Sequence, residues 1–246
     1  MKKFVLLFIV LFSINIFSQE KYLGDGPFNQ LIIRGVTLIN GDGSPPRGPV
    51  DIIVEKNLIK DIKSVGYPGI QIKDSRRPKL KKDGFELDAN GMYLLPGFID
   101  LHGHIGGNGQ GADYDYVFRL WMAHGITTVR EPGGRGIDWA LNLKKLSSEN
   151  KIVAPRIFAY TSFGQSGKNF NPLNDAPIST PEMARIWVRA NAKKGADGIK
   201  FFGADPEIMT AALEENKKLG LGSAAHHAQL SVARWNVLHS ARAGLT

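Results

Sequence analysis

Short apolar runs, separated by turn residues, follow one another along the first third of the chain. β-branched and apolar side chains fill residues 31–39 and 50–54, and a shorter piece of the same kind follows at 57–62. The stretch between the first two runs, GDGSPPRGP, is rich in glycine and proline and is typical of a turn. This pattern predicts a small β-rich domain over residues 19–92.

From residue 93 onwards, short apolar runs alternate with segments that have a helical pattern. The run GFIDLH is mostly apolar, as expected of a strand that is buried on both faces. We expect strands at 97–102, 126–129, 156–160, 198–202 and 222–226, and helices at 114–123, 139–146, 181–194, 206–219 and 228–242, with a polar loop at 161–178. This alternation predicts a parallel α/β architecture over 93–246, and both a (β/α)8 barrel and a doubly wound sheet fit it.

Residues that can carry chemistry fall at the ends of the predicted strands. In both architectures the functional site lies at the carboxyl ends of parallel strands. The residues found there are His102, His104, Arg130, Glu131, Lys200, His226 and His227. This coincidence indicates an enzyme.

Composition narrows the classes of protein that remain. The chain has 246 residues, of which 43% are apolar and 22% charged, so it is long enough to bury a full core. These values exclude a disordered chain, a collagen-like chain and a polytopic membrane protein. The absence of cysteine excludes disulfides, thiolate metal ligands and a cysteine nucleophile, so any metal must be held by nitrogen and oxygen ligands.

Residues 1–18 are typical of a secretory signal peptide. Lys2 and Lys3 precede a nearly unbroken apolar run from Phe4 to Phe12, and cleavage is expected after Ser18 or Gln19. An uncleaved membrane anchor is the alternative, although the apolar run is short for a span. We expect an exported protein, periplasmic or secreted, with no stable membrane association after cleavage.

The net charge of +8 has a local contribution from the basic stretch KDSRRPKLKKDG at residues 73–84. No aromatic side chains interleave with these charges to stack on bases. We therefore expect an exposed, solvated loop and no nucleic-acid partner.

His102 and His104 flank one glycine at the end of a predicted strand. Side chains at positions i and i+2 of an extended segment point the same way, so two imidazoles can hold one metal ion. A pair of surface histidines is the alternative. The apolar strand before the pair and the glycine-rich segment after it favour the metal site.

Four longer motifs follow one another along the chain: LDANGMYLLPGFIDLHGH, GITTVREPGG, MARIWVRANAKKGADGIKFF and LGLGSAAHHA. Together they resemble the amidohydrolase superfamily, in its imidazolonepropionase-like and prolidase-like branch. LIIRGVTLINGDG and DIIVEKNLIKDI are similar to the small β-domain that accompanies that barrel. The resemblance covers most of residues 31–246 and the amino-terminal portion of the family pattern.

The resemblance implies a distorted TIM-like (β/α)8 barrel with one or two divalent metal ions, usually zinc. His102 and His104 match the ligands of the first strand, and Lys200 matches a lysine that is carboxylated in members with two metals. His226 matches the ligand of the fifth strand, with His227 as the alternative if the register slips by one residue. Glu131 stands where the family often has aspartate and receives no catalytic role. Arg130 either lines the pocket or forms a structural salt bridge.

The sequence ends at ARAGLT, before the family's sixth-strand histidine and its eighth-strand aspartate, which shuttles the proton. We therefore expect an incomplete barrel, 93–246, that carries five β/α units, and little or no hydrolase activity of this chain alone. The catalytic residues stay unassigned for this reason.

For the complete protein the resemblance implies metal-dependent hydrolysis of a C–N bond through a metal-activated water. The expected substrates are small: a peptide, an N-acyl amino acid or a cyclic amide. A lactonase or deaminase on the same scaffold is one alternative, and a catalytically dead fragment that acts as a binding module is another. The sequence leaves open the substrate, the identity and number of the metal ions, and the oligomeric state.

Overall fold

The computed structural model describes residues 26–106, 111–163, 178–202, 204–226 and 236–245. Contacts divide the chain into two compact units, Met1–Leu95 and Pro96–Thr246. The domain boundary predicted from the sequence, between residues 92 and 93, lies close to this division. The predicted signal peptide, 1–18, lies outside the described residues. Within the described parts of the chain, no helix has the length and the apolar character needed to cross a bilayer.

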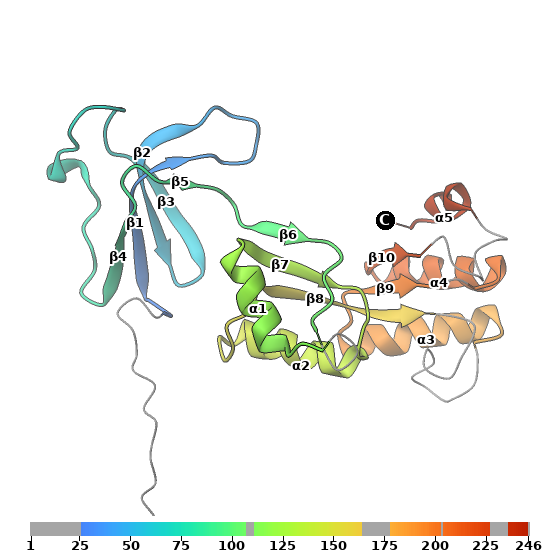
Figure 1. Cartoon of the computed structure of the whole chain (residues 1–246). Coiled ribbons are helices and arrows are strands. Elements are labelled where there is room, and N and C mark those ends of the chain that lie inside the picture. The colour runs from blue at the N-terminus through green and yellow to red at the C-terminus, as the bar shows by residue number, and fades with distance from the viewer. Residues whose placement is uncertain (1–25, 107–110, 164–177, 203, 227–235, 246) are drawn as a thin grey trace, which may run out of the picture. The chain divides into compact units, whose positions relative to one another are not determined.

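The first unit is a five-stranded sheet (Figure 1). Its strands are β1 (Gln30–Leu38), β2 (Arg47–Glu55), β3 (Leu58–Ser64), β4 (Gly84–Asp88) and β5 (Tyr93–Leu94). β2 pairs antiparallel with both β1 and β3, whereas β4 and β5 pair with β1 in parallel. Val36, Val50 and Ile52 form the centre of its apolar core, as the β-branched runs predict.

The basic stretch at 73–84 is not only a solvated loop. It contains a short 3₁₀ helix, Asp74–Arg76, and the next side chain, Arg77, turns inward. Arg77 donates two hydrogen bonds to the carboxylate of Asp51, whose side chain is fully buried in β2. One arginine of this stretch thus stabilises the fold, since a buried carboxylate requires donors.

The second unit alternates strands and helices throughout. Its elements are β6 (Phe98–Asp100), α1 (Tyr114–Ala123), β7 (Ile126–Glu131), α2 (Ile137–Ser148), β8 (Arg156–Phe163), α3 (Pro181–Lys194), β9 (Gly198–Phe201), α4 (Pro206–Lys218), β10 (Gly222–Ala225) and α5 (Val237–Arg242). The start of α3 follows from its sequence, because the Thr180 hydroxyl accepts a hydrogen bond from the Met183 amide and Pro181 occupies the first turn.

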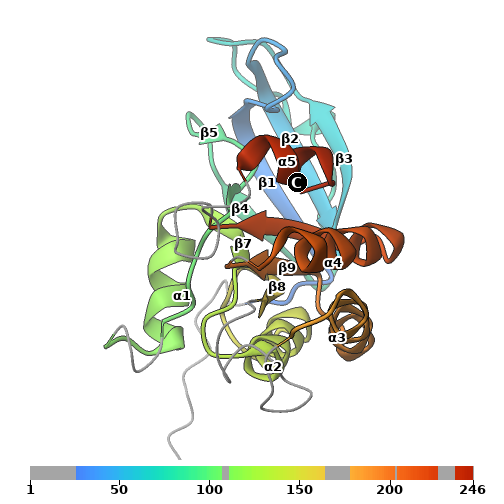
Figure 2. The same ribbon diagram turned by 90° about the vertical axis from the view of Figure 1, so that its right-hand side faces the viewer.

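All five strands of this unit are parallel, in the order β10-β9-β8-β7-β6. The sheet curls, and Figure 2 shows α1, α2 and α3 around its outer side. This order follows the chain from strand to strand, as in a barrel wall, whereas a doubly wound sheet reverses direction part-way. The described strands form a curved half-barrel sheet and not a closed barrel.

Apolar side chains fill the space between the sheet and its helices. Trp187 and Val188 of α3 pack with Ile199 and Phe201 of β9 and with Phe163 of β8. A second cluster joins α1 and α2 to β7 and β8. These clusters bury one face of each strand and leave the opposite face for the interior of the half-barrel.

Some predicted boundaries were wrong. The strand predicted at 97–102 covers only Phe98–Asp100, and β8 continues to Phe163 into the predicted loop. The helix predicted at 228–242 appears as α5, Val237–Arg242, while 227–235 lie outside the described residues. β4 was missed, because its segment carries two acidic residues and forms a strand by pairing with β1.

Candidate metal centre

Two of the four predicted ligands, Lys200 and His226, lie on the interior face of the half-barrel, near its carboxyl edge. Ile199 and Phe201 of β9 pack toward the helices, so Lys200 between them faces the interior. Lys200 pairs in register with Ala224 of β10, and His226 follows two residues later on the same face. The backbone amide of His226 donates a hydrogen bond to the Phe201 carbonyl, which continues the pairing beyond β10.

The three described histidines of the prediction lie close to one another. The ring centre of His102 lies 5.4 Å from that of His104 and 6.2 Å from that of His226. Two imidazoles on one tetrahedral zinc ion, with Zn–N bonds of about 2.1 Å, have ring centres about 5 Å apart. The spacing of these rings is therefore close to that of a shared ion. His227, the alternative ligand, lies outside the described residues.

Lys200 is a buried amine without a carboxylate partner among the described residues. Its residue surface is 2% exposed, and its ammonium group lies 5.7 Å from the centre of the Phe202 ring. Burial lowers the pKa of Lys200, and the positive charge of Arg130 lowers this pKa further. A lowered pKa increases the fraction of neutral amine, which carries a lone pair.

The histidines share this electrostatic environment. Burial lowers the pKa of His102 and of His226, and the charge of Lys200 lowers both pKa values further. Both rings therefore favour the neutral form, which is the form that binds a metal ion.

The structure supplies one direct sign of an unfilled bonding position. Nδ1 of His226 is buried and has no hydrogen-bond partner among the described residues. The described side chains nevertheless contain no group of three His, Cys, Asp or Glu residues already arranged to hold a metal ion. The residue types and the spacing of the imidazoles fit a metal ion, but the described side chains are not yet in positions that would coordinate one together.

Arg130 and Glu131 end β7 and have different partners. Arg130 donates to the Leu101 carbonyl and lies over the Tyr160 ring, with no carboxylate partner among the described residues, so it is not the salt bridge considered from the sequence. Glu131 is 1% exposed and contacts the ring of His104. Sequence reasoning gave Glu131 no catalytic role and did not find its contact with His104, although a carboxylate at the end of a buried strand needs hydrogen-bond donors.

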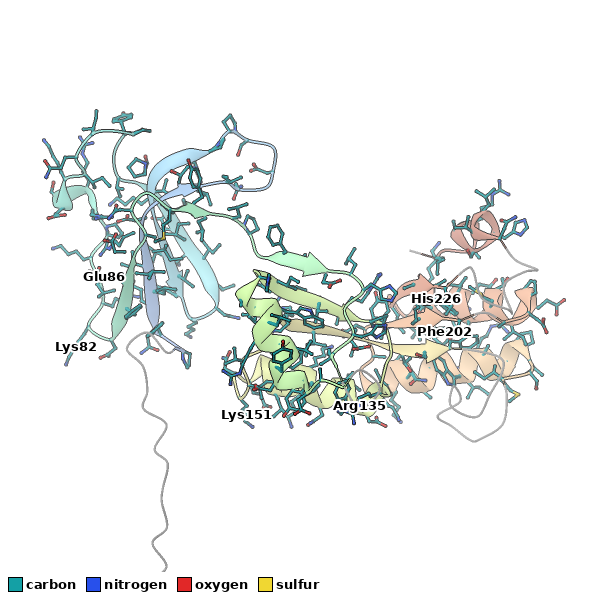
Figure 3. All side chains as sticks on the ribbon, viewed as in Figure 1. Lys82, Glu86, Arg135, Lys151, Phe202 and His226 are labelled. Carbon is teal, nitrogen blue, oxygen red and sulfur yellow. The ribbon has the colours of Figure 1, made fainter. Side chains whose placement is uncertain are left out.

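A cavity of about 480 Å³ is lined by Gly134, which lies next to the His104 ring, and by Phe202, which contacts His226. The loop after β7 and the start of α2 form one wall, and Ser162 and Phe202 also line it. The Phe202 ring stacks on the His226 ring with centres 5.2 Å apart, and Figure 3 labels both side chains. Phe202 thus connects the cavity lining to the His226 ring, and Arg135 adds a cation to the lining.

Comparisons with known proteins found partial matches in sequence and broader matches in fold. No family model matches the chain. It is 36% identical over 76 residues to a dihydroorotase from Thermoanaerobacter sp. (strain X514), which is 31% of this chain and 14% of that protein. It is 32% identical over 108 residues to adenine deaminase 2 from Desulfotalea psychrophila (strain LSv54 / DSM 12343), which is 40% of this chain and 18% of that protein.

Solved structures match over most of the chain. An Xaa-Pro dipeptidase with methionine bound in its active site matches 88% of this chain and 60% of its own length, with a TM-score of 0.61 and 23% identity. An amidohydrolase matches 88% and 59%, with a TM-score of 0.64 and 19% identity. The chain is amidohydrolase-like in sequence and in fold.

The resemblance predicted from the motifs is thereby confirmed. A prolidase in complex with N-methylphosphonate-L-proline has the same fold, with a TM-score of 0.62 and 18% identity over 88% of this chain. This amidohydrolase-like chain spans about three fifths of the length of the solved structures that it matches. The names of these proteins describe hydrolases that act on C–N bonds.

Proposed function

We propose that this chain forms the metal-binding part of a hydrolase that cleaves a C–N bond in a small amide. One observation carries the proposal: the imidazoles of His102, His104 and His226 meet a buried amine at the carboxyl edge of one parallel sheet. The similarity to a dipeptidase, a dihydroorotase and a deaminase supports the same reaction class.

In this proposal His102 and His104 hold a divalent ion, such as zinc, from the segment after β6, and His226 holds it from the segment after β10. When bound, the ion polarises the substrate carbonyl and lowers the pKa of water. Lys200, as a neutral amine, attacks carbon dioxide and releases one proton. The resulting carbamate is an anionic ligand that can bridge two ions.

The cavity supplies the space for the substrate. Arg135 lines it and lies 5.0 Å from the centre of the Trp139 ring, with no carboxylate partner among the described residues. A guanidinium in this position suits a carboxylate on the substrate. We therefore favour a peptide or an N-acyl amino acid over an uncharged cyclic amide.

Zinc binding by single-site variants tests the proposal. We expect the wild-type chain to bind zinc, and His102→Ala and His226→Ala to weaken this binding at least tenfold, measured by calorimetry and elemental analysis. His124→Ala is the matched control, because the ring of His124 bonds to the Leu120 carbonyl at the end of α1 and lies outside the candidate site. Equal zinc affinity in all four proteins would contradict the proposal.

We also propose that the 246-residue chain binds metal but hydrolyses amides slowly or not at all. Glu131 is the one described carboxylate that bonds to these imidazoles, and Ile105 and His104 occupy both of its oxygens. Among the described residues, no carboxylate that contacts these imidazoles is therefore free to pass a proton to the leaving nitrogen. Rapid metal-dependent release of amino acids from dipeptides would overturn this proposal.

A deaminase is the second candidate, favoured by the similarity to adenine deaminase 2 over 108 residues. Ammonia release from adenine, compared with amino acid release from dipeptides and N-acetyl amino acids, separates the two reactions.

Export is proposed from the sequence of residues 1–18 alone. Amino-terminal sequencing of the protein from its host should find a chain that begins at Gln19 or Glu20. An intact Met1 in that protein would contradict cleavage and favour a membrane anchor.

A further inference from the structure

Glu131 is a buried carboxylate, and its hydrogen bonds indicate a role in the candidate metal centre as well as in the fold. Its side chain is 1% exposed, and no lysine or arginine forms an ion pair with it among the described residues. Oε2 accepts a hydrogen bond from the Ile105 amide at 2.7 Å, and Oε1 lies 3.2 Å from Nδ1 of His104. Burying a carboxylate is costly, and here both partners belong to the segment that carries two predicted metal ligands.

The contact determines where the proton of the His104 ring lies. When the Glu131 carboxylate is ionised it only accepts hydrogen bonds, and Nδ1 of His104 is then the donor in this contact. A neutral imidazole carries one ring proton, and a proton on Nδ1 leaves the lone pair on Nε2. Nε2 is then the nitrogen available to an ion.

The surroundings keep the carboxylate in place. Glu131 is the last residue of β7 and pairs in register with Ala159 of β8, while the side chain of Ile105 is fully buried. The loop after β7 folds back over the contact. A Cβ atom on Gly134 would lie 3.3 Å from Oε1 of Glu131 and 3.6 Å from Nδ1 of His104. The loop backbone therefore covers the bond and limits the access of water to it.

We propose that Glu131 is a positioning residue, which holds His104 as the Nδ1–H tautomer and aims the Nε2 lone pair at the metal centre. Carboxylates on the second nitrogen of a ligating histidine act in this way in metal sites generally. Glu131 itself touches neither ion nor substrate. The inference rests on the proposed function, because it assigns Glu131 to the same centre.

Nitrogen NMR of the metal-free chain tests the tautomer directly. With ¹⁵N-labelled histidine, and with the signals assigned by single substitutions, wild-type His104 should show a protonated Nδ1 and an unprotonated Nε2. In Glu131→Gln and Glu131→Ala the proton should redistribute toward Nε2. An unchanged His104 spectrum in both variants would overturn the inference.

Zinc affinity is the second readout. Glu131→Gln, which keeps the shape of the side chain, should bind zinc 10- to 100-fold more weakly than the wild type. Leu213→Ala is the control, because it removes buried contacts of the same unit from a cluster that contains none of the candidate ligands. An equal loss of zinc affinity in the two variants would show that Glu131 acts only through the stability of the fold, and it would overturn the inference. A wild-type chain without zinc affinity would refute the proposed function, while the NMR measurement would still decide the role of Glu131 on the ring.

Discussion

The Tyr160 ring packs so closely against two neighbouring strands that it restricts which residues they can carry. Its ring lies over two glycines of neighbouring strands, and Arg130 stacks on its face. A Cβ atom on Gly222 would lie only 1.9 Å from the Tyr160 hydroxyl oxygen, and one on Gly198 would lie 2.4 Å from Cζ of that ring. Glycine is therefore required at both positions by close approach.

We expect Gly222→Ala to lower the free energy of unfolding by about 1–3 kcal/mol, because the new methyl group overpacks the interior. The four tryptophans of the chain all lie beyond residue 95, so their fluorescence during urea unfolding reports on this unit. In a Tyr160→Leu background the same substitution should cost much less. Equal costs in both backgrounds would show that Tyr160 is not the obstacle.

The buried amine of Lys200 is expected to form a carbamate that contributes to zinc binding. With zinc and ¹³C-bicarbonate, the wild-type chain should give a carbamate carbon signal, and Lys200→Ala should lose both this signal and part of its zinc content. Lys151→Ala is the control, because Lys151 is exposed and pairs with Glu149. Unchanged zinc content in Lys200→Ala would contradict the carbamate bridge.

The sequence predicts the candidate ligands better than it predicts the hydrogen bonds that hold these ligands in place. His102 and His104 are found from their spacing at a strand end, and Lys200 and His226 from the ordered motifs. The bond from His104 to Glu131 joins residues 27 positions apart. It depends on the pairing of β6 with β7 and on the path of the loop after β6, which no local pattern encodes.

Among the elements, the parallel strands and their helices follow from the sequence because each strand is short, apolar and followed by an amphipathic segment. The first unit is less predictable. β4 pairs with β1 across more than 45 residues, and Arg77 leaves a basic stretch to bond to β2. Such contacts depend on tertiary structure and override the local preference for a loop.

The Asp51 carboxylate ties β1, β2 and the basic stretch together. It accepts hydrogen bonds from Arg34, from Arg77 and from the Gly35 amide. We expect Asp51→Asn to destabilise the first unit by about 3 kcal/mol, because two arginines lose a buried partner. Faster hydrogen exchange in peptides from β1 and β2 checks this. Exchange that matches the wild type would contradict it.

The same carboxylate makes this unit sensitive to acid. Burial alone raises the pKa of Asp51, but the hydrogen bonds from Arg77 and Arg34 outweigh burial and hold this pKa below its ordinary value. A lowered pKa in the folded state stabilises the fold above about pH 3.9, the pKa of an unfolded aspartate. This stabilisation is lost as the pH falls through the folded value. The difference between wild type and Asp51→Asn should therefore shrink between pH 7 and pH 3.

At the scale of the whole molecule, the described half-barrel leaves both edge strands with one neighbour each. β6 pairs only with β7 and β10 only with β9 among the described strands. Around β6, Phe98, Ile99 and Leu101 are each about 60% exposed. An exposed apolar edge of this kind favours pairing with another chain.

We therefore expect concentration-dependent self-association of the 246-residue chain, and less of it in Ile99→Lys, because a charge on an edge strand opposes pairing. Light scattering after size-exclusion chromatography measures both proteins. A wild-type chain that stays monomeric at high concentration would show that the β6 edge does not promote self-association.

We propose that imidazoles from the two edges of the half-barrel and the amine of Lys200 surround a common metal ion. Anomalous X-ray scattering at the zinc absorption edge, from crystals grown with zinc, tests it most directly. We expect a peak within bonding distance of the imidazole nitrogens of His102, His104 and His226 and beside Nζ of Lys200. A peak elsewhere, or none at this edge of the sheet, would contradict it.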